Sequence, residues 1–117
     1  MGAVVDVVNE ETLDWARKKA AKEGNVLLLQ FGNSKCVKCP EFSKEVEELK
    51  NNYTFMHCYC DTHLAEEILE EYGVTSVPSI VLFKEHMSVS FLSCSIETLK
   101  AEVKSHCNTI LKLDEEF

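Results

Sequence analysis

Residues 26–42 read VLLLQFGNSKCVKCPEF, in which an apolar run stands directly before two cysteines. A continuous apolar run such as Val26–Phe31 is typical of a β-strand that is covered on both faces. After the cysteines, Pro40 suits the first turn of a helix, where its missing N–H does no harm. The sequence therefore predicts that Cys36 and Cys39 lie at a strand-to-helix junction.

The spacing of these two cysteines suits a redox-active dithiol. A C-x-x-C pair between a strand and a helix is typical of such dithiols. Unpaired N–H groups and the macrodipole favour negative charge at a helix N-terminus, and the thiolate is the reactive form of cysteine. We therefore expect Cys36 to be the nucleophile and Cys39, one turn further on, to lie within reach of it. Lys35 and Lys38 would add two cations near the thiolate, unless they simply point into water.

Strand and helix patterns alternate along the rest of the chain. The predicted strands cover residues 4–8, 26–31, 53–60, 79–83 and 88–92. Thr12 is predicted to cap the first helix, Leu64 to mark the third, and Ile110 to lie on the apolar face of the fourth. This alternation predicts a mainly parallel sheet with helices on both faces and an antiparallel edge from the final hairpin. Chemistry in such sheets gathers at the carboxyl ends of the strands, where Cys36 falls.

Size and charge narrow the class of protein. A chain of 117 residues fits one domain, predicted to span residues 1–117. Twelve basic against twenty acidic side chains give a net charge of −8, which disfavours a nucleic-acid partner. No apolar run approaches the ~20 residues of a membrane span. The N-terminal residues 1–6 lack the pattern of a secretory signal, so we expect a reducing, cytoplasmic location.

Two separated motifs, and the order of the elements, resemble the thioredoxin family over nearly the whole chain. The first motif is the C-x-x-C pair, and the second is VTSVPS at residues 74–79, which leads into a strand. The resemblance implies a thioredoxin fold of class α/β, with a mixed, mostly parallel five-stranded sheet flanked by four helices. It also implies a cis bond between Val77 and Pro78, whose backbone groups would pair with a substrate segment. Val77 and Pro78 are therefore candidate substrate-binding residues.

The chain departs from the family around the dithiol. Lys35 stands where the family commonly has tryptophan, and Val37-Lys38 replaces glycine-proline, which makes the surface that a partner meets more charged. Residues 92–94 read LSC where thioredoxins usually carry a glycine near the peptide groove. Side chains there would narrow the groove or change the choice of partner.

Gln30 is a further departure, because it stands where thioredoxins commonly carry a buried aspartate that exchanges protons with the second cysteine. An amide does not titrate near neutral pH, but a buried one needs hydrogen-bond partners, since leaving it unpaired costs roughly 1–3 kcal/mol. By the family pattern, His57 on the next strand could lie nearby. Histidine titrates near neutrality and could shuttle the proton instead, or it could be a satisfied core residue.

The resemblance implies a thiol–disulfide oxidoreductase that exchanges disulfides with protein partners. We expect a monomer with no bound cofactor and no metal. Because the sequence has no phosphate-cradling glycine loop and no flavin motif, a separate reductase or a small thiol would supply the electrons. The alternative is a catalytically weak binding module or redox sensor that has kept the fold.

Four further cysteines need an explanation. Buried core packing is the default for free cysteines, and here these are Cys58, Cys60, Cys94 and Cys107. A second alternative is structural zinc held by the C-x-x-C pair together with Cys58 and Cys60. Residues two apart on a strand share a face, and the family pattern turns that face toward the core rather than toward Cys36.

Overall fold

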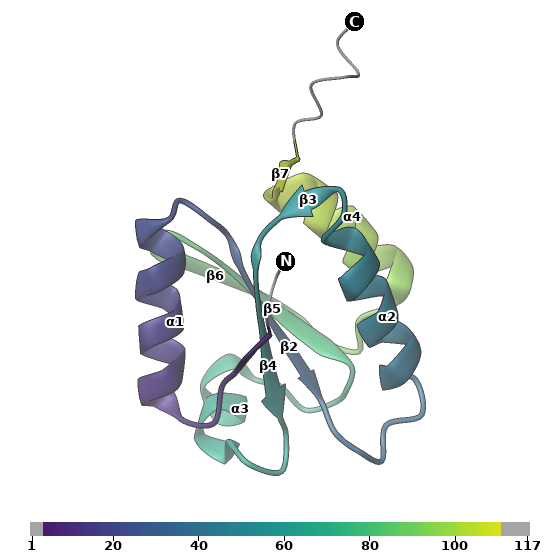
Figure 1. Cartoon of the computed structure of the whole chain (residues 1–117). Helices are drawn as coiled ribbons and strands as arrows, with labels where there is room; N and C mark the ends of the chain where they lie inside the picture. The colour runs from purple at the N-terminus through teal and green to yellow at the C-terminus, as the bar shows by residue number, and fades with distance from the viewer. Residues whose placement is uncertain (1–3, 111–117) are drawn as a thin grey trace, which may run out of the picture.

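A five-stranded sheet runs through the centre of the molecule (Figure 1). The computed structural model describes residues 4–110, so the first three residues and residues 111–117 lie outside the described part. The sheet consists of β1 (Val5–Asp6), β4 (Met56–Asp61), β2 (Leu27–Gly32), β5 (Ser79–Lys84) and β6 (Met87–Phe91), in that order across it. The single domain predicted for residues 1–117 extends beyond these residues and stays a prediction.

The sheet is mixed, as the resemblance implied. Strand β4 lies parallel to both β1 and β2, whereas β5 lies antiparallel to β2 and to β6. Gln30 in β2 therefore stands beside Tyr59 of β4 on one side and Ile80 of β5 on the other. The hairpin of β5 and β6 supplies the antiparallel edge that the sequence predicts.

Helices cover both faces of the sheet (Figure 1). Helices α1 (Glu10–Lys22) and α3 (Glu66–Tyr72) pack on one face, and α2 (Cys39–Leu49) and α4 (Ile96–His106) pack on the other. Within residues 4–110, no helix has the length and apolar composition needed to cross a lipid bilayer.

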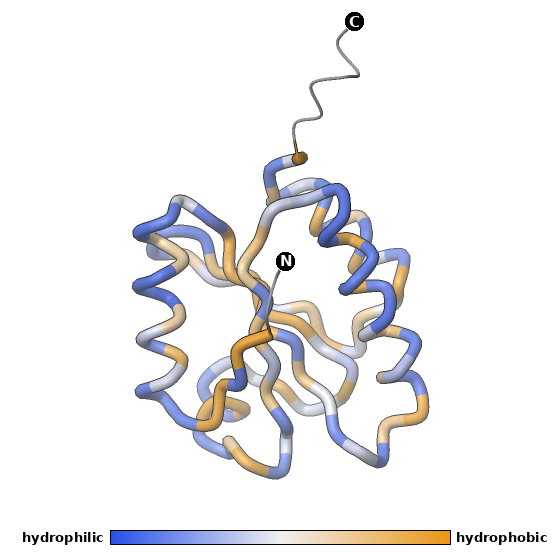
Figure 2. The backbone as a smooth tube through the Cα atoms, in the orientation of Figure 1, coloured by the Kyte–Doolittle hydropathy of each residue, from blue (hydrophilic) through white to orange (hydrophobic). Residues whose placement is uncertain are grey.

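Strand β2 divides the core between these two layers. Leu27, Leu29 and Phe31 pack toward α1 and α3, while Leu28 packs toward α2 and α4. Successive side chains of a strand point to opposite faces, so a strand covered on both sides must be apolar at almost every position. Figure 2 shows this as a hydrophobic centre, with helices that alternate between hydrophilic and hydrophobic colour. The polar side chain of Gln30 is the exception within this buried strand.

The boundaries of several elements differ from the predictions. The first strand is limited to Val5–Asp6, and Asn9 rather than Thr12 caps α1. Asn9 Oδ1 accepts a hydrogen bond from Thr12 N, and Thr12 Oγ1 accepts one from Asn9 N, so Thr12 is the third helical residue of a capping box.

The prediction for the third helix was wrong at its start. Leu64 lies before α3 and is exposed, because Asp61 holds a turn there: its carbonyl accepts from Leu64 N and its carboxylate from His63 N.

The predicted strand over residues 53–60 is two strands. Strand β3 (Tyr53–Thr54) leaves the main sheet and pairs with β7 (Asn108–Thr109). This pairing requires extended backbone after α4, and Cys107 adopts it, so the helix ends at His106. Ile110 therefore lies beyond the last helix rather than on its apolar face.

Candidate active site

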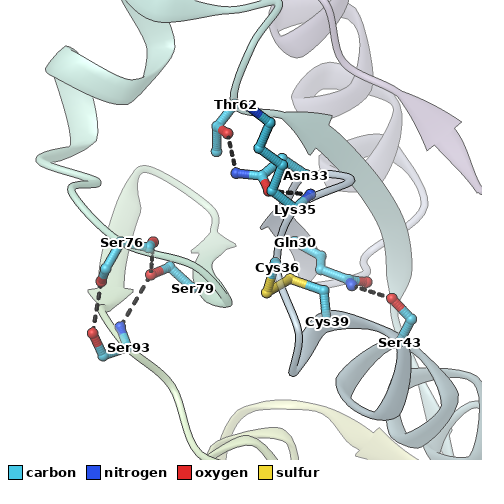
Figure 3. The surroundings of a disulfide bond; sticks show 10 residues. All are labelled: Gln30, Asn33, Lys35, Cys36, Cys39, Ser43, Thr62, Ser76, Ser79 and Ser93. Carbon is cyan, nitrogen blue, oxygen red and sulfur yellow. Dashed lines mark hydrogen bonds between the residues drawn. A yellow bond between two sulfur atoms is a disulfide. The ribbon is translucent and has the colours of Figure 1, made fainter.

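The loop between β2 and α2 carries the cysteine pair. Asn33 anchors it in two directions: its Oδ1 accepts from Lys35 N at 2.9 Å, and its Nδ2 donates to Thr62 Oγ1 at 2.9 Å (Figure 3). Because Thr62 directly follows β4, the loop is tied to the ends of two neighbouring strands. The cysteines therefore lie at the carboxyl edge of the parallel strands, where the sequence places them.

Cys36 and Cys39 form a disulfide (Figure 3). Their Cα atoms are 5.3 Å apart, within the usual range for a disulfide. Cys39 is the first residue of α2 and only 6% exposed, whereas Cys36 is partly exposed in the turn before the helix. Cys36 thus lies ahead of the first helical turn rather than in it, and it is the more accessible of the two sulfurs.

The bond between Val77 and Pro78 is cis, as the resemblance implied. Pro78 is buried and Val77 half-buried at the start of β5. An open groove runs past Pro78, and its lining residues include Lys38, Phe42, Cys94 and Ile96. The structure therefore brings the cis-proline and the lysine between the two cysteines to the same groove.

Three serines that the sequence analysis missed hold the cis-proline turn. Ser79 Oγ donates to Ser76 O at 2.7 Å and accepts from Ser93 N at 3.1 Å, and the Ser76 and Ser93 hydroxyls are 2.6 Å apart (Figure 3). Ser93 lies in the segment where the family carries glycine, and its φ of 48° is a left-handed conformation that glycine adopts easily. Ser76 and Ser79 flank Pro78 closely enough in sequence to suggest a hydrogen-bonded turn. Their common partner, Ser93, is 17 and 14 residues further along, so the sequence did not reveal it.

Gln30 is buried, at 1% exposure, and its amide is paired on both sides. Its Nε2 donates to Ser43 Oγ of α2 at 2.7 Å (Figure 3), and its Oε1 lies 2.8 Å from His57 Nε2. Because this oxygen can only accept, the His57 proton lies on Nε2. The expectations that a buried amide needs partners and that His57 lies nearby are both confirmed.

His57 is 5% exposed, and its burial lowers its pKa to about 4, assisted by the Lys50 ammonium. Glu47 acts in the opposite direction, but its Oε2 is 3.6 Å from His57 Nδ1 and only 2.7 Å from Lys50 Nζ. The hydrogen bond from Lys50 in turn lowers the pKa of Glu47. Since 3.6 Å is too long for a hydrogen bond, Nδ1 has no hydrogen-bond partner within residues 4–110, and with its lowered pKa His57 is neutral at pH 7.

The two lysines beside the dithiol are exposed, and Val37 between the cysteines is 92% exposed. The surface around Cys36 is thus a mixture of cationic groups and one apolar side chain. Exposure of both Lys35 and Lys38 means that solvent screens their effect on the sulfur.

Tyr59 was also missed. A Cβ added to Gly32, at the end of β2, would lie 2.9 Å from Tyr59 Oη and 3.2 Å from Cys39 Sγ. The phenol therefore shares a small space with the buried sulfur. A glycine at the end of a strand of bulky residues indicates that another group packs closely against the backbone there. The sequence pattern does not identify that group.

The other cysteines are buried, and burial raises the pKa of each thiol, to about 12 for Cys58 and about 11 for Cys60, Cys94 and Cys107. Cys58 and Cys60 pack toward α1 and α3, on the face of the sheet away from α2. In the part of the chain that the structure describes, no three histidine, cysteine or acidic side chains converge as a metal site would require. The zinc alternative therefore has no geometric support here.

Comparison with known proteins gives one consistent family. A family model described as a thioredoxin-like domain matches residues 13–88. The chain is similar to a thioredoxin of Schistosoma mansoni, at 17% identity and a TM-score of 0.75, over 90% of this chain and 99% of that one. It is also similar to thioredoxin O1 of Arabidopsis thaliana, at 22% identity and a TM-score of 0.74, over 90% of this chain and 98% of that one. No curated protein sequence matches the chain.

Proposed function

This chain belongs to the family of thioredoxin-like domains, and on that premise we propose that it is a thiol–disulfide oxidoreductase acting on protein disulfides. One observation carries the proposal: a disulfide joins an accessible sulfur, Cys36, to a buried one, Cys39. The groove beside Pro78 lies next to this pair and is open to solvent. An asymmetric pair of this kind can react with a partner through one sulfur and release it through the other.

The reduced protein would act in two exchange steps. Cys36 thiolate attacks a client disulfide, so that a bond forms between Cys36 and one client sulfur while the other leaves as a thiolate and takes a proton from solvent. Cys39 thiolate then attacks Cys36, the mixed disulfide breaks, and the second client sulfur leaves as a thiolate. The client gains two electrons, and the protein is left with the Cys36–Cys39 bond that the structure contains.

The client would lie in the groove beside the cis-proline. Main-chain groups around Val77 would pair with an extended client segment, while Pro78 stays buried beneath it. Lys35 and Lys38 would meet the client on the opposite side and favour anionic flanking residues. The three serines hold this turn in place and leave the backbone of the groove preorganised.

Gln30 and His57 would influence the site by fixing the packing of β2 against α2, and not by transferring a proton. The Gln30 amide links β2 to Ser43 of α2, which lies four residues after Cys39 in the same helix. His57 fixes the orientation of that amide. Because His57 is neutral with its proton held by Gln30, it has no proton to give at pH 7.

Turnover requires an electron source outside the chain. We propose a separate reductase or a small thiol for this role, with no bound cofactor, in a reducing compartment such as the cytoplasm. The buried thiols with raised pKa values would remain inert there.

A disulfide-reduction assay tests the function. With dithiothreitol as electron donor, the wild-type protein should accelerate the reduction of insulin, and Cys36→Ser should abolish this. Cys39→Ser should instead accumulate a mixed disulfide with the client, because the resolving sulfur is missing. Cys107→Ala removes a buried cysteine outside the site and should keep the activity. Absence of any Cys36-dependent acceleration with folded protein would contradict the proposal.

The second candidate is a redox-dependent binding module, and the pairing of Gln30 favours it. The Gln30 amide stands where the family carries a titrating aspartate, and it forms hydrogen bonds with Ser43 and His57. A protein without a proton-exchanging group at this place would resolve mixed disulfides slowly. Partner binding that differs between the oxidised and reduced protein, combined with no turnover in any reducing system, would favour the module over the enzyme.

A further inference from the structure

Two reactive groups, the Tyr59 phenol of β4 and the Cys39 sulfur of α2, close around Gly32 of β2 and fill the place that a side chain there would take. A Cβ at this position would meet Tyr59 Oη at 2.9 Å, Cys39 Sγ at 3.2 Å and Tyr59 Cε1 at 3.3 Å. All three distances are shorter than ordinary van der Waals contact, so the phenol and the sulfur both lie close to the Gly32 backbone. The absence of a side chain on Gly32 lets the Tyr59 hydroxyl and the Cys39 sulfur both approach this point of β2.

The register of the sheet brings Tyr59 to this place. Tyr59 pairs with Gln30 in the parallel ladder between β4 and β2, and Asp61 pairs with Gly32. Side chains alternate along β4, so Tyr59 and His57 share the face opposite to Cys58 and Cys60. That face carries α2, whose first residue is Cys39.

The Tyr59 hydroxyl is available as a donor. Among residues 4–110 the structure gives it no hydrogen bond, to the disulfide-bonded Cys39 sulfur or to any other group, and it is not among the buried atoms that lack a partner. The Gln30 amide, by contrast, already bonds Ser43 and His57. Burial raises the pKa of Tyr59, and the charges of Asp61, Cys60 and Asp6 act in the same direction. At neutral pH the phenol therefore keeps its proton and can donate a hydrogen bond but cannot act as a base.

Cys39 needs such a donor when it becomes a thiolate. Cys39 is only 6% exposed, and a buried anion is costly unless nearby polar groups stabilise it. Where the family carries a buried aspartate, this chain has Gln30, and the Gln30 amide already forms hydrogen bonds with Ser43 and His57.

We propose that the Tyr59 hydroxyl is a catalytic hydrogen-bond donor to the Cys39 sulfur, stabilising its thiolate in the step that resolves the mixed disulfide. The inference rests on the proposed oxidoreductase function. In this step Cys39 thiolate forms the bond to Cys36, the Cys36–client bond breaks, and the client sulfur departs with the electron pair and takes a proton from solvent. Tyr59 donates a hydrogen bond throughout and gives up no proton.

Tyr59→Phe tests the donor, because it removes the hydroxyl and keeps the ring. Tyr53→Phe is the matched control, since Tyr53 lies in β3, beyond the far end of α2 (Figure 1). In a Cys36→Ser background Cys39 titrates by itself, and its ¹³Cβ shift reports the charge of the sulfur. Tyr59→Phe should move the midpoint of this titration up by about one pH unit, while Tyr53→Phe should leave it unchanged.

The rate of resolution supplies a signature that a structural role would not produce. A thiolate of higher pKa is less abundant but more nucleophilic, with a Brønsted coefficient of about 0.4–0.5. Below both midpoints, Tyr59→Phe with both cysteines present should release a disulfide-linked peptide about threefold more slowly than wild type. Above both midpoints it should release the peptide about threefold faster.

The two proposals fail in different ways. An unchanged Cys39 titration in Tyr59→Phe, or a rate lowered equally at every pH, overturns the role of Tyr59 and leaves the oxidoreductase intact. Absence of Cys36-dependent reduction in wild type overturns the function, while the Cys39 titration still decides whether Tyr59 stabilises the thiolate.

Discussion

Two buried polar residues, Gln30 and His57, replace a titrating carboxylate with neutral groups beside the disulfide. Gln30 and His57 are among the few polar side chains in the core, and each satisfies the other through one hydrogen bond. The other ring nitrogen of His57, Nδ1, lies 3.6 Å from the Glu47 carboxylate, which forms an ion pair with Lys50 instead. A buried imidazole in this position costs stability once it must carry a proton.

The stability of the protein should therefore fall as the pH is lowered from about 6.5 to about 4. His57 has a folded pKa of about 4 against a model value of 6.5, so the unfolded chain binds the proton first and the neutral fold is destabilised across this window. The loss amounts to about 3 kcal/mol if His57 acts alone. Urea unfolding of wild type and His57→Gln between pH 4 and pH 8 measures it.

The variant His57→Gln should show a much flatter dependence over this window, because glutamine can still donate to Gln30 but does not titrate. His86→Gln is the control, since His86 is exposed in the turn between β5 and β6. A pH dependence in His57→Gln as steep as that of wild type would show that other groups cause the acid sensitivity.

At the scale of elements, the end of β6 is held in an unusual backbone conformation. Ser93 has a φ of 48°, and its N–H and hydroxyl bond to Ser79 and Ser76 beside the cis-proline. Left-handed backbone is unfavourable for residues with a Cβ and most unfavourable for β-branched ones. The hydrogen bonds of the two partner serines offset that cost here.

Substitutions at Ser93 should follow this backbone preference. Ser93→Gly should stay close to the wild-type stability, because relief of the left-handed conformation offsets the loss of one hydroxyl contact. Ser93→Val should lose roughly 1–2 kcal/mol or more. Ser88→Val, an exposed extended position in β6, is the control and should change little. Chemical denaturation measures all three, and equal stability of Ser93→Val and Ser93→Gly would contradict the strain argument.

At the scale of the whole molecule, the site is the meeting point of elements that are distant in sequence. The dithiol loop is tied to the end of β4, the cis-proline turn to the end of β6, and Gln30 to α2. Gly32 of β2 lies between two of them, since any side chain there would press on Tyr59 of β4 and Cys39 of α2.

Gly32→Ala should therefore destabilise the protein by roughly 1–3 kcal/mol, because the new methyl group overpacks a closed space between rigid elements. Tyr59→Phe removes the atom at 2.9 Å, so the double variant should recover part of the loss. A double-mutant cycle by chemical denaturation measures this coupling. Strictly additive effects would mean that the chain relieves the clash elsewhere.

Local patterns in the sequence were enough for the alternation of strands and helices, but not for the antiparallel pairing of β5 with β2. The apolar run of β2, the helical spacing after Pro40 and the hairpin before α4 each reflect interactions within one element or between neighbours. Boundaries were less predictable: Asn9 and Thr12 form one capping box, and the predicted strand at residues 53–60 divides because β3 pairs with β7. Pairing between distant strands leaves little trace in either strand alone.

By itself, the sequence placed a cysteine pair at the carboxyl edge of a sheet, because strand periodicity and helix starts are local properties. The resemblance to a family added the cis bond before Pro78. The sequence could not reveal the hydrogen bond between Gln30 and His57, although the family resemblance placed the two near each other, nor that three serines hold one turn, nor that Tyr59 and Cys39 both lie against Gly32. Those contacts depend on the register between strands and on the packing of a helix against them, and a shift of one residue would turn each of these side chains to the other face.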